Sequence, residues 1–377
     1  MTFRVLTTCG VFEPGFRGGG PVRSLALLVD TAPVDVDLTL VTRDRDVRAG
    51  APYPGLSGRW IRRGRAEVFY LAVRDPRAWA ALWRRVRGVR YDVLYVNSVW
   101  SPVFTVLPVL ARRLGVLRAR RVVVAPRGEL SAGALSRKAW KKRPVLGPWG
   151  GVLRSLDVTW HASTGREAAD IRRVYPWARV QVSLNQVPMP PEPLAPIPGR
   201  GPARFVFVSR IVPEKNLLLV IEALAGLPGD AELDIFGPVE DAGYWRRCRQ
   251  AIEDGGLAAR VRYRGELAPA TVRDTFRHYD AFLFPTRGEN FGHVIAESLS
   301  ASCPVICSDR TSWTPVLRAG GGTVIPEPSP ARLRAEIARV AARPAAERLA
   351  ARRAAGAAYA LWRAGTSNEN FLATLAR

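Results

Sequence analysis

Short apolar runs alternate with amphipathic stretches along most of the chain. In the first half, runs rich in Val, Leu and Tyr predict buried strands, and several stretches between them have the apolar spacing of helices. The predicted strands are Phe3–Thr8, Asp37–Thr42, Glu67–Val73, Asp92–Asn97, Arg121–Ala125 and Asp157–Ala162, and the predicted helices are 22–29, 77–87, 102–115 and 164–174. This alternation is typical of a parallel sheet covered on both faces by helices.

The same pattern returns after a proline-rich stretch. Residues 188–202 contain seven prolines, which indicate an extended, semi-rigid linker. Beyond it we expect strands at 203–210, 232–236, 260–263, 281–284, 305–307 and 323–325, then a mostly helical tail from Ala331 to Ala364. The sequence therefore predicts two α/β domains, 1–187 and 203–354, followed by a C-terminal helical segment, 355–377.

Composition agrees with a two-domain globular protein. A chain of 377 residues with 47% hydrophobic residues is long enough for two cores. No uninterrupted apolar stretch approaches the roughly 18 residues of a membrane-spanning helix, and we interpret the N-terminus as a strand, not a signal peptide. The four cysteines follow no scaffold or zinc pattern, which fits a cytoplasmic location.

Charge is the main oddity. The net charge is +23, and residues 112–143 hold eleven Lys and Arg against one acid, Glu129. Such a segment suits nucleic acid, an anionic membrane or a phosphorylated substrate. Because no nucleic-acid-binding motif accompanies it, we favour membrane or phosphate. Trp140 lies among these cations, and we weigh an interfacial segment equally with an ordinary surface helix.

One strand-loop-helix stretch carries the clearest chemistry. The apolar run 281–284 ends at Pro285 and opens into a glycine-bearing loop, after which a helix begins near Gly292. Seven residues separate Glu289 in the loop from Glu297 in the helix. Backbone N–H groups at a helix start favour an anion, and carboxylates accept hydrogen bonds from hydroxyls. The pair therefore predicts a site for a nucleotide sugar.

Glu289, Phe291–Gly292, Glu297 and the following Cys303–Ile306 run together resemble the Glu-x7-Glu motif of retaining GT-B glycosyltransferases of family 4, also called group 1. The resemblance implies an α/β GT-B fold, in which two Rossmann-like, doubly wound parallel-sheet domains face each other across a cleft. It also implies a UDP- or GDP-linked sugar donor on the second domain, transfer with retention, and neither metal nor cofactor.

The resemblance assigns roles in the second domain. Glu297 would hold the ribose hydroxyls, and Glu289 would hold the sugar hydroxyls. The backbone N–H groups of Asn290, Phe291 and Gly292 would hold the sugar and phosphate. Arg210 and Lys215 resemble the family's diphosphate-gripping pair, although Ser209 and Asn216 replace its glycines. Gly237 ends a strand where a nucleotide base can approach the backbone.

In the first domain, the resemblance points to two strand ends. The loop after the first strand contains Gly18, Gly19 and Gly20, and such a loop closes over donor and acceptor in the family. Arg127 follows a later strand, where many members have a histidine, and we expect it to hold acceptor phosphate or the leaving diphosphate. We interpret His161 as structural, with Thr164 capping the next helix and Glu167 in capping-box position.

Two further expectations concern other segments. The family's last helix crosses back to the first domain, and Tyr359, Trp362 and Phe371 are candidates for that docking. Two Asp-x-Asp pairs match a metal-binding motif of another glycosyltransferase architecture. We interpret the pair at 35 and 37 as a strand edge, and the pair at 44 and 46 as a solvated loop.

The sequence thus predicts a retaining, metal-independent hexosyltransferase that moves a sugar from a nucleotide-sugar donor to a saccharide or lipid-linked acceptor in surface polysaccharide or glycoconjugate biosynthesis. We expect it in the cytoplasm, in peripheral contact with an anionic membrane. Another GT-B enzyme, such as a sugar-nucleotide epimerase, stays open. A non-enzymatic nucleic-acid-binding protein is suggested by charge alone, and we expect no nucleic-acid partner.

Overall fold

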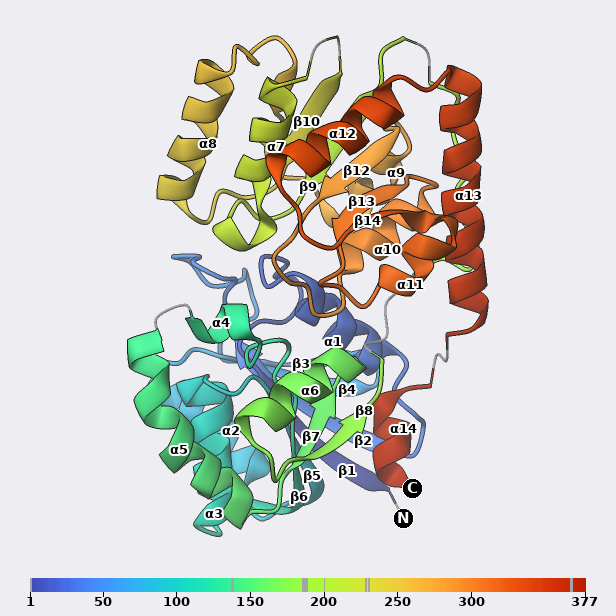
Figure 1. Ribbon diagram of the computed structural model, residues 1–377. Coiled ribbons are helices and arrows are strands. Elements are labelled where there is room, and N and C mark those ends of the chain that lie inside the picture. Colours follow the sequence, from blue (N-terminus) through green and yellow to red (C-terminus); the bar gives the residue numbers. More distant parts are fainter. Residues whose placement is uncertain are drawn as a thin grey trace. The chain divides into compact units, whose positions relative to one another are not determined.

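The computed structural model describes residues 2–136, 139–184, 189–199, 201–227, 229, 231–366 and 369–377. The chain divides into two compact units, Met1–Pro188 with Ser367–Arg377, and Met189–Thr366. Each unit is built around its own sheet (Figure 1). No helix among the described residues is long and apolar enough to cross a membrane.

Within the described residues, the first unit contains an eight-stranded sheet in the order β3-β4-β2-β1-β5-β6-β7-β8. All neighbours are parallel except β3 and β4. The strands are β1 (Phe3–Cys9), β2 (Val36–Arg43), β3 (Trp60–Arg63), β4 (Ala66–Leu71), β5 (Arg90–Asn97), β6 (Arg118–Val124), β7 (Thr159–Ala162) and β8 (Arg179–Val182). Strand order reverses between β1 and β5, and open parallel sheets bind ligands at such a reversal.

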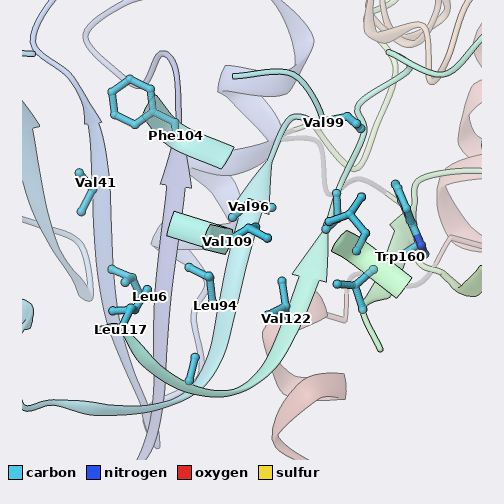
Figure 2. Close-up of a cluster of buried hydrophobic side chains, with 14 of the residues drawn as sticks. Leu6, Val41, Leu94, Val96, Val99, Phe104, Val109, Leu117, Val122 and Trp160 are labelled. Carbon is cyan, nitrogen blue, oxygen red and sulfur yellow. The ribbon is translucent and has the colours of Figure 1, made fainter. Parts of the chain in front are cut away.

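Two apolar clusters cover the two faces of this sheet, because successive strand residues point to opposite sides. Leu6 belongs to the cluster in Figure 2, and its neighbour Val5 to the other. The first cluster packs against α2 (Pro76–Val86), a π-helical turn (Pro102–Val106), α3 (Leu107–Arg113), α5 (Ala139–Ser155) and α6 (Gly165–Val174). The other packs against α1 (Gly20–Asp30) and α14 (Phe371–Ala376). The short α4 (Ala132–Ser136) has no buried residue.

The second unit contains a fully parallel sheet in the order β11-β10-β9-β12-β13-β14, six strands within the described part of the chain. They are β9 (Arg204–Val208), β10 (Glu232–Phe236), β11 (Val261–Tyr263), β12 (Ala281–Phe284), β13 (Val305–Ser308) and β14 (Gly322–Ile325). Order reverses between β9 and β12. The predicted strands of both halves are therefore present, together with β3 and β8, which the sequence pattern missed.

Two groups of helices flank the second sheet. Helices α7 (Leu217–Ala225), α8 (Ala242–Asp254) and α12 (Pro330–Ala341) pack together, and α9 (Val272–Phe276), α10 (His293–Ser300) and α13 (Ala345–Ala364) form the other group (Figure 1). The short α11 (Thr314–Val316) packs with α13. Right-handed crossovers on either side of the reversal place the two groups on opposite faces.

The proline-rich stretch does not behave as a free linker in its described part, 189–199. Its carbonyl groups are bound by the second unit: Ser302 Oγ donates to Leu194 O at 2.6 Å and Arg352 Nη1 to Ile197 O at 2.5 Å. Arg273 Nη2 donates to Glu192 O at 2.6 Å. Proline lacks a backbone donor, so most of these bonds use carbonyl oxygens of the stretch, and Leu194 N donates to Ser300 O at 2.7 Å. Pro188 and Arg200 lie outside the described residues.

The chain crosses to the first unit later than the sequence suggested. Phe371 is buried in the first unit and stacks on His161, with ring centroids 3.7 Å apart. Tyr359 and Trp362 were expected to dock there, and this was wrong. Tyr359 donates to Pro190 O at 2.6 Å, and Trp362 packs on Trp313, so both belong to the second unit.

Candidate active site

The candidate active site lies at the carboxyl ends of β9 and β12, which are neighbours at the strand-order reversal of the second sheet. The segment after β9 carries Arg210 and a 3-10 turn, Pro213–Lys215. The loop after β12 carries Glu289 and leads into α10. Because parallel strands end at the same edge, residues 74 positions apart come together.

Lys215 and Glu289 form the centre of this site. Lys215 Nζ donates to Glu289 Oε2 at 2.5 Å, and the two side chains are 9% and 19% exposed. The ammonium also lies 5.3 Å from the centroid of the Phe284 ring. A buried charge needs such partners, since burial alone disfavours the charged form. The predicted pair of site residues is thus brought into direct contact.

The carboxyl of Glu289 is held in its charged form. Burial raises its pKa, but the ammonium of Lys215, the charge of Arg210 and the Asn290 N–H together outweigh burial, so the pKa lies below the usual 4.5. Arg210 itself is half-exposed and donates to Glu240 Oε2 at 2.9 Å. Two positive charges, those of Lys215 and Arg210, therefore act on the Glu289 carboxylate.

Hydrogen bonds to backbone carbonyl groups hold together the loops that carry the pair. Thr286 Oγ1 donates to Glu214 O at 3.1 Å, and Arg287 N donates to the same carbonyl at 2.8 Å. Asn216 Nδ2 donates to Pro285 O at 3.1 Å from a left-handed backbone, φ 62°. Asparagine tolerates that conformation, so Asn216 supplies what glycine supplies in the resembling motif.

The start of α10 depends on Gly292, whose φ is 80°. A Cβ there would lie 3.0 Å from Glu289 Cγ and 3.3 Å from the Trp313 ring. Phe291 is buried against Trp313, and the Trp313 Nε1–H donates to the Phe291 carbonyl at 2.5 Å. The Phe291 side chain is therefore a packing anchor, which leaves its backbone N–H for the predicted contact. Sequence reasoning missed Trp313.

The remaining predicted residues of the second unit have distinct settings. Glu297 is half-buried in the second turn of α10, on the same face as His293. Gly237 has φ 137°, and a Cβ there would lie 1.9 Å from the carbonyl oxygen of Ser209. The close approach of the β9 and β10 ends thus requires glycine at 237, whatever binds beside it.

In the first unit, the glycine-rich loop follows β1 at the other strand-order reversal. Gly19 has φ 69° and precedes α1, which begins at Gly20, and a Cβ at Gly18 would lie 2.6 Å from the Val22 side chain. Asp46 accepts from Phe16 N at 3.0 Å and from Arg17 N at 3.2 Å. The reading of the 44–46 pair as solvated was wrong, because both carboxyl groups are buried and Asp46 anchors this loop.

Arg127 lies at the end of β6 with φ 54°. Its Nη2 donates to Asn97 Oδ1 at 2.7 Å and to the Tyr95 hydroxyl at 2.8 Å. His161 is buried, contacts the same hydroxyl at 2.7 Å, and burial with the charge of Arg127 lowers its pKa to about 3. The structural reading of His161 is therefore confirmed.

Two acidic residues of this unit, Glu167 and Glu129, support the turn at Arg127. The sequence had predicted a structural role only for Glu167. Thr164 Oγ1 caps α6 by accepting from Glu167 N at 3.1 Å, as predicted. The Glu167 carboxylate accepts from Gly128 N at 2.6 Å and Ser163 N at 2.7 Å, which ties the turn to β7. Glu129 accepts from Val99 N at 2.6 Å, and burial raises its pKa. The sequence signal that could have identified the role of Glu129 was its position directly after Gly128 in a turn.

Some predicted features lie outside the description. The basic segment around Trp140 includes Arg137 and Lys138, which the structure does not describe. Trp140 is 74% exposed. Arg127 and Gly18–Gly20 belong to the first unit and the Lys215–Glu289 pair to the second, so each group stands within its own unit.

Comparison with known proteins identifies the fold and a partial family match. The fold matches sucrose-phosphate synthase from Thermosynechococcus elongatus with a TM-score of 0.75 at 15% identity, covering 99% of this chain and 96% of that one. Anabaena HepE in complex with UDP-glucose matches with a TM-score of 0.69 at 17% identity, covering 96% and 95%. The chain has the α/β GT-B fold, as expected. Residues 197–357 match the family model described as glycosyl transferases group 1.

Curated relatives match over shorter segments. A phosphatidyl-myo-inositol mannosyltransferase of Mycobacterium leprae is 30% identical over 112 residues, 29% of this chain and 28% of the relative. The protein of that name from Mycobacterium tuberculosis H37Rv is 36% identical over 78 residues, 20% and 21% of the two chains. The chain thus matches less than a third of the length of either relative.

Proposed function

We propose that the protein is a retaining glycosyltransferase that moves a sugar from a nucleotide-sugar donor to a saccharide or lipid-linked acceptor. The buried Lys215–Glu289 pair at the strand-order reversal carries this proposal. It lies inside the segment that matches group 1 glycosyl transferases. At this edge of the sheet, the carboxylate of such a pair can accept hydrogen bonds from the hydroxyls of a donor, and the ammonium can bind its phosphates.

The proposed roles follow from charge and position. Lys215 and Arg210 stabilise the negative charge that grows on the departing nucleoside diphosphate, so that no metal is required. Glu289 stays ionised because its pKa is lowered, and accepts hydrogen bonds from sugar hydroxyls. Glu297 holds the ribose, and the N–H groups before α10 hold the sugar and phosphate. The solved structure of Anabaena HepE in complex with UDP-glucose supports the proposal that the donor is a nucleotide sugar.

In the proposed reaction, the bond from the anomeric carbon to the diphosphate oxygen breaks as the acceptor oxygen approaches the same face of the sugar. The leaving phosphate takes the acceptor's proton, so the protein supplies orientation and charge and needs no nucleophile. Arg127 of the first unit would hold acceptor phosphate. The names of the mycobacterial relatives and of WaaG, described as involved in lipopolysaccharide biosynthesis, favour a lipid-linked or surface-saccharide acceptor.

Turnover of the full chain with nucleotide-sugar donors tests the proposal. Lys215→Ala and Arg210→Ala should each lower the transfer rate by at least about 100-fold, which corresponds to about 2.7 kcal/mol of transition-state stabilisation. Arg353→Ala, an exposed change on α13, should leave the rate unchanged. Far-UV circular dichroism checks that each variant is folded.

Product analysis completes that experiment. Retention of the donor's anomeric configuration in the product, established by NMR, supports the proposed mechanism. Full activity in both cation variants would refute the diphosphate role. Conversion of the donor in the absence of any acceptor would indicate an epimerase instead.

A further inference from the structure

Two uncharged side chains of β5 hold the guanidinium of Arg127 in the first unit. Arg127 Nη2 donates to Asn97 Oδ1 at 2.7 Å and to the Tyr95 hydroxyl at 2.8 Å, and Arg127 Nε donates to the same Asn97 oxygen at 3.2 Å. An amide oxygen is a neutral acceptor, and burial raises the pKa of Tyr95 to about 12, so its hydroxyl is neutral too. These contacts fix the plane of the guanidinium without cancelling its charge.

The two acceptors are themselves oriented by the sheet. Residues two apart on a strand share a face, and β5 pairs in parallel with β6, at whose end Arg127 lies. The Asn97 amide nitrogen donates to Thr7 Oγ1 at 3.3 Å and to Thr8 O at 3.4 Å, both on β1. The oxygen of the amide therefore faces Arg127.

The direction of the Tyr95 hydroxyl follows from its contact with His161. His161 Nε2 lies 3.0 Å from Ser183 O, and because a carbonyl only accepts, the proton of the ring is on Nε2. Burial and the charge of Arg127 lower the pKa of His161 to about 3, so the ring is neutral and Nδ1 carries no proton. The Tyr95 hydroxyl, 2.7 Å away, therefore donates to Nδ1 and turns a lone pair towards Arg127.

The acidic side chain at this turn, Glu167, is directed to backbone groups. Its carboxylate oxygens accept from Gly128 N at 2.6 Å and from Ser163 N at 2.7 Å. Arg127 itself is half-buried. Removing a cation from water is costly, and neutral acceptors offset only part of that cost, so an anion that reaches the guanidinium binds favourably. The fork of N–H groups on arginine matches the oxygens of a phosphate.

We propose that Asn97 and Tyr95 are positioning residues that select a phosphate-bearing substrate: they hold the Arg127 guanidinium through uncharged acceptors and leave its charge for the ligand. His161 takes part by fixing the direction of the Tyr95 hydroxyl. The proposal rests on the proposed transfer to an acceptor that carries phosphate. Selectivity depends on the absence of charge at position 97, because an aspartate there would form an ion pair with Arg127 and would compete with the phosphate.

Asn97→Asp separates charge from shape. It keeps the oxygen that Arg127 binds and loses only the two long hydrogen bonds of the amide nitrogen. Inorganic phosphate, titrated into the full chain, should bind Asn97→Asp at least about tenfold more weakly than the wild type. Ser155→Asp, which adds the same charge at an exposed position of α5, should bind phosphate as the wild type does. Circular dichroism checks that each variant is folded.

The histidine ring gives a readout at this site, because the chain contains only three histidines. In protein labelled with nitrogen-15 histidine, NMR should show a proton on His161 Nε2 and none on Nδ1 at pH 7, and both ring signals should shift as phosphate binds. Their absence in His161→Gln identifies them. Tyr95→Phe should move the Nδ1 signal, because Nδ1 loses its donor, and should weaken phosphate binding about fivefold. This second variant keeps the test decisive if Asn97→Asp does not fold.

The outcomes separate this proposal from the donor site. The response of His161 to phosphate should disappear in Arg127→Met and persist in Lys215→Ala. A proton on Nδ1, no response of His161 in the wild type, or equal phosphate affinity in the wild type, Asn97→Asp and Tyr95→Phe would overturn the proposal. A response that survives in Arg127→Met, or is lost in Lys215→Ala, would place the phosphate elsewhere and overturn it too. Donor binding, measured separately, reports on the proposed function alone.

Discussion

Lys215 and Glu289 show how a single residue pair can define a site. Each charge alone would be costly in so buried a place, and together they compensate each other at 2.5 Å. Arg210 adds positive charge but keeps nearly half of its side chain in solvent. The site therefore combines one buried cation, Lys215, with one half-exposed cation, Arg210.

The Glu289 pKa gives a prediction at this scale. Because the folded-state pKa is lowered, the pair stabilises the fold fully above the usual value of 4.5, and that contribution is lost as pH falls through the lowered value. At pH 7, Glu289→Gln should lower the free energy of unfolding by about 3 kcal/mol, since it leaves the Lys215 ammonium buried without its partner. Urea denaturation at pH 7, 5, 4 and 3 should show the difference between the two proteins shrinking with acidity. A difference that is the same at every pH would contradict the role of this carboxylate.

At the scale of elements, the loop after β12 is held by groups from outside it. Trp313 donates its indole N–H to the Phe291 carbonyl at 2.5 Å, and Trp362 of α13 packs on Trp313 with ring centroids 4.4 Å apart. The aromatic stack links the long helix α13 to the start of α10. The position of Glu289 is thus set by distant packing as well as by its own loop.

Trp313→Phe isolates the hydrogen bond from the packing. We expect a loss of about 1–2 kcal/mol in the free energy of unfolding, because the Phe291 carbonyl loses a buried donor. Donor affinity should weaken by about tenfold, because the donor must then restore the position of the loop. A cost of about 1.4 kcal/mol corresponds to a tenfold change in affinity. Trp362→Phe is a matched control that removes a similar volume but leaves the hydrogen bond intact. Calorimetric titration of both variants with a donor would contradict this account if they weakened equally.

At the scale of the whole molecule, the chain forms two units, and C-terminal segments complete the packing of each: α14 in the first unit and α13 in the second. Phe371 in α14 completes a core of the first unit, and Asn370 Nδ2 donates to Leu28 O at 2.8 Å. In the second unit, Arg352 is 2% exposed and donates to the carbonyl groups of Ser302, Ile197 and Arg277. One buried arginine thus fastens α13 to the proline-rich stretch.

These two residues should affect the units separately. Phe371→Ala should cost the first unit about 3–5 kcal/mol through the cavity it leaves. Arg352→Met should cost the second unit roughly 2–4 kcal/mol, because three carbonyl groups lose their donor. Hydrogen exchange with mass spectrometry should show loss of protection in the strands of one sheet in each variant. Equal loss in both sheets for both variants would contradict the division into two units.

Much of this fold could be predicted because buried parallel strands such as β9 and β12 are nearly continuous apolar runs between turn residues. The edge strands β3 and β8 were missed because four residues each, Trp-Ile-Arg-Arg and Arg-Val-Gln-Val, have too little apolar pattern. The Glu289 loop was recognised from local spacing. Its contact with Lys215, and the roles of Trp313, Asp46 and Glu167, depend on which strand ends meet, and one sequence does not contain that information locally.

The most direct test of the central claim is calorimetric titration of the full chain with a panel of UDP- and GDP-linked sugars, in wild-type and Lys215→Ala forms. We predict that one donor binds the wild type with one-to-one stoichiometry and that Lys215→Ala weakens its affinity at least about tenfold, or about 1.4 kcal/mol. Binding of that donor with unchanged affinity in the variant, or binding of none of the panel to the wild type, would contradict the claim that the Lys215–Glu289 site holds an activated sugar.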